Sequence, residues 1–233
     1  MRLNNYLNEV STGKDIEQLK QDCSIFINDL KKQKKSFIEF IYSGRKGSNT
    51  IIKKDVRQNR RPLDTPEGIH DMIDNEFFDE FGYKPRSSSL FCYVDYRKTM
   101  AYGKTYVIFP IDKYKLIWSP KVTDLYDHLS KKFRPYIRYV KSGGNTRPVW
   151  LGMDEFEQNN FNSYQEFKEY LESGEAKQDL KSYIYDLVRS YKVSDASDIP
   201  NIPTNNEIML MTKSYYGVQY KEFDLVYKEI FGE

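Results

Sequence analysis

A short apolar run near the C-terminal end of the chain, Ile208–Met211, begins directly after a carboxylate, that of Glu207. Turn-forming residues bound the run on both sides, which predicts a buried β-strand. An ion in an apolar interior is costly, so a carboxylate at the mouth of such a strand must stay in water or perform a task that needs fixed negative charge. Taken alone, Glu207 is best explained as an exposed strand-end residue.

The composition predicts a folded, aromatic-rich protein. The chain has 233 residues, of which 39% are hydrophobic and 15% aromatic, enough for one large domain. Lys and Arg number 36 against 34 Asp and Glu, a net charge of +2 that does not by itself indicate a nucleic-acid binder. Two cysteines and two histidines match no metal-ligand spacing, so no metal is expected. We expect neither a signal peptide nor a membrane span, hence a reducing, cytoplasmic location.

Hydrophobic periodicity predicts a chain of mixed helices and strands. Helices are expected over residues 15–33, 65–82, 122–132, 161–191 and 223–231, with one or two helical turns over 95–102. Ser173-Gly174 is expected to divide 161–191 into two helices. Strands are expected over residues 36–42, 105–111, 114–118, 136–140, 149–151, 207–212 and 215–220. Loops are expected over residues 50–64, which are basic, and 194–206.

The clearest helix is 65–82. Thr65 is a good N-cap and Gly82 can end the helix. Phe77 belongs to its apolar stripe, and His70 flanks that stripe, so we expect a structural role for the histidine.

Three separated stretches contain candidate site residues. The first is Ile-Tyr-Ser-Gly-Arg at 41–45, where Gly44 allows close backbone approach to a ligand and Arg45 supplies a permanent cation. The second is Ser-Leu-Phe-Cys-Tyr-Val-Asp at 89–95, followed by Ala-Tyr-Gly at 101–103. The third is the strand that Glu207 opens. Each stretch alone is also typical of an ordinary turn or strand end.

In this order, the three stretches resemble the motifs of the ADP-ribosyltransferase superfamily. The resemblance covers residues 36–118 and 204–220. It implies an α+β fold around a split, mostly antiparallel sheet with flanking helices. The whole chain, 1–233, would be one such domain, with an N-terminal helical segment at 1–35 and a helical and hairpin insertion at 122–200.

Two motif positions stay open. The family's first-motif Arg or His falls on Ser43, and Arg45 could replace it because alternate residues of an extended strand share a face. The second-motif residue is Ser87, Ser89 or Phe91. Asn205 stands where arginine-modifying members carry a further acid, which argues against arginine as the acceptor.

The resemblance implies a mono-ADP-ribosyltransferase that uses NAD as co-substrate and no metal. Glu207 and Arg45 would be the catalytic residues, Glu207 stabilising an oxocarbenium-like ribosyl species. Ser43 and the open second-motif position would help to bind NAD. The Gly44 backbone would hold the nicotinamide amide, Tyr102 would stack on the ring, and Arg45 would hold the pyrophosphate.

The acceptor and the reaction have alternatives. Basic segments at 53–61 and 134–147 slightly favour nucleic acid, RNA or DNA, over protein. Members of the superfamily often act as toxins or in conflict between phage and host, so the resemblance is compatible with an inhibitory, antitoxin-like partner. No membrane partner is expected. The alternatives are a non-enzymatic nucleic-acid or protein-binding module, an NAD glycohydrolase, and an RNA 2′-phosphotransferase-like enzyme.

Overall fold

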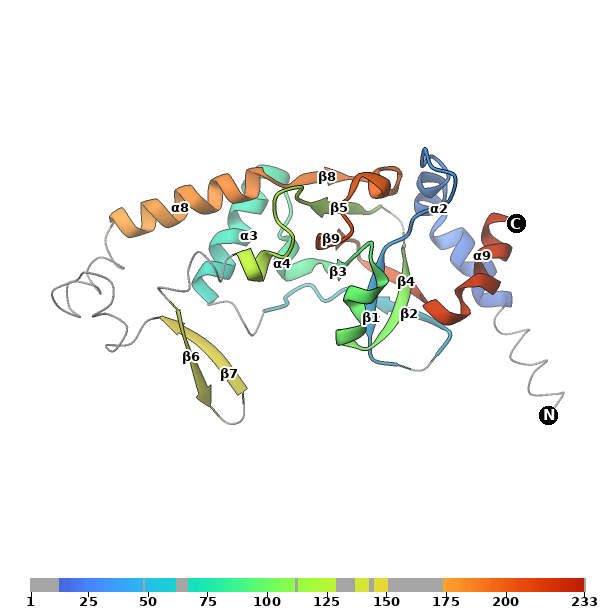
Figure 1. Cartoon of the computed structure of the whole chain (residues 1–233), viewed down its shortest axis with the longest axis horizontal. Coiled ribbons are helices and arrows are strands. Elements are labelled where there is room, and N and C mark those ends of the chain that lie inside the picture. The colour runs from blue at the N-terminus through green and yellow to red at the C-terminus, as the bar shows by residue number, and fades with distance from the viewer. Residues whose placement is uncertain are drawn as a thin grey trace. The chain divides into compact units, whose positions relative to one another are not determined.

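The computed structural model describes residues 13–47, 49–61, 67–111, 113–128, 137–142, 145–150 and 174–232. The chain forms two compact units, and neither is continuous in sequence. The first unit comprises Met1–Gln58, Ser88–Pro120 and Lys192–Glu233, and the second comprises Asn59–Ser87 and Lys121–Tyr191. Helices and antiparallel sheets together make the protein an α+β protein (Figure 1).

The first unit contains two four-stranded antiparallel sheets. One has the order β1 (Tyr42–Arg45), β4 (Lys104–Pro110), β10 (Ser214–Gln219), β2 (Ile51–Asp55). The other has the order β3 (Leu90–Cys92), β9 (Ile208–Met211), β5 (Lys115–Trp118), β8 (Lys192–Ser194). An isolated bridge links β1 to the end of β3, where Tyr42 and Tyr93 exchange backbone hydrogen bonds of 2.8 and 2.9 Å. The bridge therefore joins the two sheets at β1 and the end of β3.

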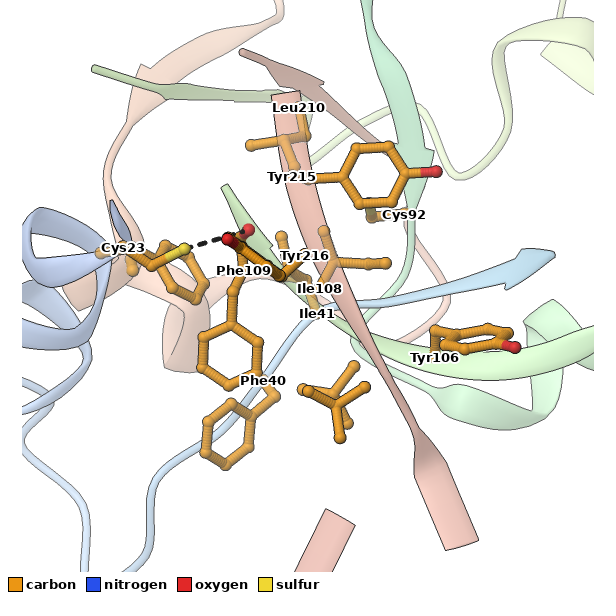
Figure 2. Packing of buried hydrophobic residues seen from close by; sticks show 14 of the residues in the cluster. Cys23, Phe40, Ile41, Cys92, Tyr106, Ile108, Phe109, Leu210, Tyr215 and Tyr216 are labelled. Carbon is orange, nitrogen blue, oxygen red and sulfur yellow. Dashed lines mark hydrogen bonds between the residues drawn. The ribbon is translucent and has the colours of Figure 1, made fainter. Parts of the chain in front are cut away.

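Aromatic rings and an N-terminal helical segment form the core of the first unit. Residues 13–22 are helical, and α2 (Ser24–Leu30) follows after a turn at Cys23. The apolar residues expected to face inward are all buried: Ile16, Leu19, Cys23, Phe26, Ile27 and Leu30. Figure 2 shows the Cys23 thiol directed at the Phe109 carbonyl oxygen, 3.5 Å away. The predicted helix at 15–33 is thus confirmed, apart from the break at Cys23.

The C-terminal helix completes that core. α9 (Phe223–Phe231) has the bounds that the sequence predicts. Its first residue, Phe223, meets the Phe40 ring edge-on at 4.9 Å between centroids, and Phe40 lies 6.3 Å from Phe109. Such tilted and edge-on ring pairs add to the stabilisation that area burial provides.

The second unit contains helices and a hairpin. Its elements are α3 (Glu67–Phe81), α4 (Pro85–Ser88), β6 (Ile137–Ser142), β7 (Asn145–Trp150) and α8 (Gly174–Arg189). Helices α3 and α8 pack together, and Phe77 of α3 is buried edge-on against Tyr191. The predicted helix at 65–82 is confirmed from Glu67 onward, and its proposed cap Thr65 lies outside the described residues. The predicted hairpin is also confirmed.

Three sequence predictions were wrong. Residues 36–41 form no strand: β1 starts at Tyr42. The apolar alternation before it reflects burial of Phe40 and Ile41, and the Ile41 carbonyl oxygen still accepts from β4, from the Ile108 amide at 3.0 Å. The basic stretch after residue 50 contains β2, because an edge strand keeps lysine side chains in solvent. The expected loop at 194–206 contains the end of β8 and a 3₁₀ helix, η4 (Ala196–Asn201).

Other predictions are confirmed in part. Residues 95–102 form a 3₁₀ helix, η1 (Tyr96–Tyr102), whose N-cap Asp95 accepts a hydrogen bond from the Arg97 amide. Residues 125–128 are helical within the expected helix at 122–132, whose remainder from 129 lies outside the described residues, as does 161–173. In the described part of the chain, no helix has the length and hydropathy needed to cross a membrane.

Candidate functional site

Strand β1 carries the first candidate motif and lies directly against η1. A Cβ atom added to Gly44 would be 2.2 Å from the Thr99 carbonyl oxygen and 2.7 Å from Tyr102 Cβ. Only glycine permits this approach. Tyr102 therefore lies beside Gly44, and its side chain is 63% exposed. A Thr99–Thr105 hydroxyl hydrogen bond of 2.8 Å ties η1 to β4.

Ser43 connects the two sheets. Its buried hydroxyl donates to the Phe91 carbonyl oxygen of β3 at 2.8 Å. The side chain thus uses its one proton within the protein, so Arg45, rather than Ser43, has donors to offer a ligand from this strand. Phe91 is half-buried on β3, and its backbone is what brings the first and second candidate motifs together.

Arg45 is a half-buried cation with no ion-pair partner among the described residues. Its guanidinium carbon lies 5.8 Å from the centre of the Tyr215 ring. Its Nε atom is buried without a hydrogen-bond partner in the same part of the chain. Buried donors in folded proteins are nearly always satisfied, by protein, solvent or ligand, so this guanidinium suits an anionic ligand.

Ser89 presents a second unsatisfied group. The residue is buried just before β3, and its Oγ atom has no hydrogen-bond partner within the described part of the protein. In the described residues of the first unit, Arg45 Nε and Ser89 Oγ are the buried side-chain atoms in this state. Both residues belong to the site predicted from sequence.

Glu207 is half-buried, immediately before β9. Cys92 pairs with Ile208, so extending the antiparallel register by one residue sets Glu207 opposite Tyr93, the residue that bridges to Tyr42. The preceding Asn206 is buried and donates to the Ser119 carbonyl oxygen at 2.6 Å, which fixes the start of the strand.

The charges of Glu207 and Arg45 act on one buried thiol. Burial raises the pKa of Cys92 to about 12, while Arg45 lowers it and Glu207 raises it. Burial also raises the pKa of Tyr215, and Arg45 opposes that shift. Figure 2 shows the Tyr215 ring beside Cys92. Arg45 and Glu207 therefore share one electrostatic environment, with a protonated thiol and a phenol as neutral neighbours.

Ser87 belongs to the second unit, not to this group. Its hydroxyl contacts Asp74 Oδ2 by a short hydrogen bond and lies 3.0 Å from His70 Nε2. Asp74 also accepts from the Arg86 amide at 2.8 Å. The buried histidine thus joins α3 to α4, in keeping with the structural role expected for it. Burial lowers the pKa of His70, and the nearby Asp74 carboxylate opposes that shift.

Sequence reasoning missed Cys92 and Tyr215 as neighbours of the candidate site. Cys92 lies within the second candidate stretch but was assigned no role there, and Tyr215 lies in none of the three quoted stretches. Only the pairing of distant strands brings the two residues to Arg45. Among the described residues, no three His, Cys, Asp or Glu side chains gather to hold a metal ion. Comparison with protein-family models, curated proteins and solved structures gives no match.

Proposed function

We propose that the protein is a mono-ADP-ribosyltransferase with a split sheet of that superfamily's type, which transfers ADP-ribose from NAD to a macromolecular acceptor. One observation carries the proposal. Arg45 Nε on β1 and Ser89 Oγ just before β3 are both buried without a hydrogen-bond partner in the described part of the protein, and the charge of Glu207 acts on the same thiol as that of Arg45.

The unsatisfied groups fit the chemistry of NAD. Its pyrophosphate is an anion for the Arg45 guanidinium, and its carboxamide and hydroxyls can pair with Ser89. In the described structure, the backbones of β1 and β3 pair only at the bridge of Tyr42 and Tyr93, beside the hydrogen bond from the Ser43 hydroxyl to the Phe91 carbonyl oxygen. Beyond that bridge, the edge of β1 facing the split has backbone groups that a carboxamide can use, as an added strand would.

The role of Glu207 follows from the bond that breaks. NAD supplies a neutral leaving group, nicotinamide, which departs with the electron pair of its bond to ribose; the acceptor nucleophile bonds to the same ribose carbon and loses a proton. Positive charge develops on the sugar as the bond lengthens. Glu207 supplies fixed negative charge in a half-buried position, where screening by water is weaker than at the surface.

The decisive test replaces Glu207 by glutamine, which keeps the shape and removes the charge. Nicotinamide release and transfer of labelled ADP-ribose to separate pools of RNA, DNA and protein are measured together. Transfer should fall by about 10²–10³-fold, with little change in NAD affinity, because the charge acts mainly in the transition state. Glu229→Gln, an exposed change on α9, is the matched control. A Glu207→Gln variant that transfers at the wild-type rate contradicts the proposal.

Binding tests the other half of the site. Arg45→Ala should raise the dissociation constant of NAD roughly tenfold, from the loss of about 1.5 kcal/mol for a charged hydrogen bond. Lys46→Ala removes the neighbouring exposed cation and should leave NAD binding unchanged. Absence of NAD binding by the wild-type protein would refute the proposal. Nicotinamide release with no labelled acceptor in any pool would instead identify a glycohydrolase.

A further inference from the structure

Three tyrosines from distant parts of the sequence meet at the surface of the first unit. Tyr96 opens η1, and Tyr220 opens η5 (Tyr220–Glu222). Their rings are stacked, with centroids 4.5 Å apart and an interplanar angle of 18°. Tyr42 of β1 meets both rings edge-on, at 6.2 Å and 5.6 Å. We call these three residues the tyrosine cluster.

The tyrosine cluster is not part of the apolar core. Tyr96 is 37% exposed and Tyr220 39%, whereas the core rings of Phe40, Phe109 and Phe223 are buried. Tyr42, half-buried, supports the stack from its edge. The stacked rings of Tyr96 and Tyr220 are partly exposed to solvent and are supported by the ring of Tyr42. They form a flat aromatic surface, on which a planar ring of a ligand can stack.

The segments that carry Tyr42 and Tyr96 have more cations than carboxylates, and the carboxylate whose charge acts on Tyr42, Glu39, is ion-paired to Lys35 at 2.6 Å. Segments 42–47 and 96–106 contain the cations Arg45, Lys46, Arg97, Lys98 and Lys104 and no carboxylate. The adjoining Asp95 is ion-paired to Arg97 at 2.9 Å. The three lysines are exposed. Met100 of η1 is also exposed, at 64%. An aromatic surface on elements that also carry exposed lysines suits a polyanion that presents flat apolar rings.

We propose that the tyrosine cluster binds an unpaired base of single-stranded nucleic acid. Single-stranded nucleic acid would then be the acceptor class of the proposed transferase, and the role of the cluster as an acceptor site rests on that proposed function. Every base has a π-face, so stacking on tyrosine is tolerant of sequence. The lysines supply contacts for the phosphates. A duplex keeps its bases stacked on one another, and they are not free to stack on tyrosine.

The position of the cluster suits an acceptor site. Tyr42 precedes Gly44 by two residues on β1, a separation of about 7 Å along an extended strand. Helix η1 carries Tyr96 at one end and Tyr102, the neighbour of Gly44, at the other. A base on the stack would thus lie within one strand segment of the residues proposed to hold NAD.

Binding is measured without NAD, by the fluorescence anisotropy of labelled RNA and DNA oligonucleotides. Single strands should bind more tightly than a duplex of equal length, and an abasic strand should bind more weakly than a normal one. Tyr96→Leu and Tyr220→Leu should each weaken binding roughly 5- to 100-fold, the effect of losing one stacking ring. Tyr220→Phe keeps the ring and should keep binding, which separates stacking from loss of fold.

A matched control lies in the second unit. Tyr185 is 40% exposed, and Tyr185→Leu should not change binding. Lys98→Gln should reduce the slope of log affinity against log salt by about 0.7, the value for one phosphate contact on a single strand. These results together would support the base-binding site.

Several outcomes would overturn it. They are no oligonucleotide binding, equal binding of duplex and single strand or of abasic and normal strands, and leucine variants that bind like the wild type. Modification of a protein acceptor without oligonucleotide binding would do the same. NAD cleavage without oligonucleotide binding leaves the NAD site standing alone, and ring-dependent oligonucleotide binding without NAD cleavage leaves the base site standing while the transferase proposal fails.

Discussion

Adding one methyl group at Gly44 should force η1 away from β1. The new Cβ atom would stand 2.2 Å from the Thr99 carbonyl oxygen, well inside the 3.0 Å that real Cβ contacts respect. The Thr99 carbonyl carbon, at 3.2 Å, is backbone as well. No rotation of a flexible side chain relieves these contacts, so the strand or the 3₁₀ helix must move by about 1 Å.

The expected cost is large for a single methyl group. Overpacking typically costs about 1–3 kcal/mol, and an obstruction made of backbone places Gly44→Ala near the upper value, about 3 kcal/mol. Two other glycines give a graded comparison. At Gly217 the nearest atom to an added Cβ is Ile52 Cγ1, a side-chain atom at 3.0 Å, so the cost should be near 1 kcal/mol. At Gly13 nothing lies within 4 Å, and no loss is expected.

The assay follows unfolding of the first unit by the fluorescence of its own tryptophan. Trp118 is buried and donates to Ser194 Oγ at 3.0 Å. Replacing the chain's other tryptophan, Trp150, by phenylalanine leaves this reporter alone. Urea melts of the three alanine variants in that background then give the free energy of unfolding. The contact argument fails if Gly44→Ala is within 1 kcal/mol of the parent, or if it costs less than the change at Gly217.

The remaining predictions concern burial. Phe77→Ala should lower the free energy of unfolding by about 3–5 kcal/mol because the ring is fully buried. Phe78→Ala, a change at an exposed ring, should lower it by less than about 1 kcal/mol. Equal free energies of unfolding in urea melts of the two variants would show that the apolar stripe of α3 is wrongly assigned. Burial lowers the pKa of His70 below 6.5 in the folded protein. As the pH falls, the unfolded chain therefore binds the proton more readily than the folded protein, and stability should decrease below pH 6.5. An NMR titration in a His128→Gln background measures this directly, and a midpoint at or above 6.5 would count against it. The Cys92 thiol, with a pKa of about 12, should resist iodoacetamide near pH 8 until the protein unfolds, and prompt alkylation of the native protein would argue that it is accessible.

Periodicity predicted the elements whose burial is one-sided. The apolar spacing at 15–33 and 223–231 anticipated helices whose inward faces pack on the first sheet. The pattern failed where apolar residues are buried without forming a strand. Phe40 and Ile41 are buried yet lie outside any strand. Lys53 and Lys54 read as loop residues, but an edge strand exposes them.

The candidate site could be predicted only in its local parts. Gly44 and Arg45 follow each other in sequence, so a short motif was enough to mark them. Ser87 carries the same residue type as Ser89, and nothing local shows that it joins His70 in the second unit. The stacked Tyr96 and Tyr220 are brought together by tertiary packing, which no periodicity encodes.

The pairing of β5 with β8 has a consequence for how this chain can change in length. Trp118 and Lys192 are register partners, and the whole segment Lys121–Tyr191 of the second unit is spliced between these two strands. Topologically it is a hairpin loop. The entropy of closing a loop grows only logarithmically, by about 0.6 kcal/mol for each doubling of a flexible loop. A lineage can therefore lengthen or shorten the part of this segment that precedes α8 without changing the register of either strand, while α8 and Tyr191 keep their packing on α3 and Arg45 and Glu207 keep their places.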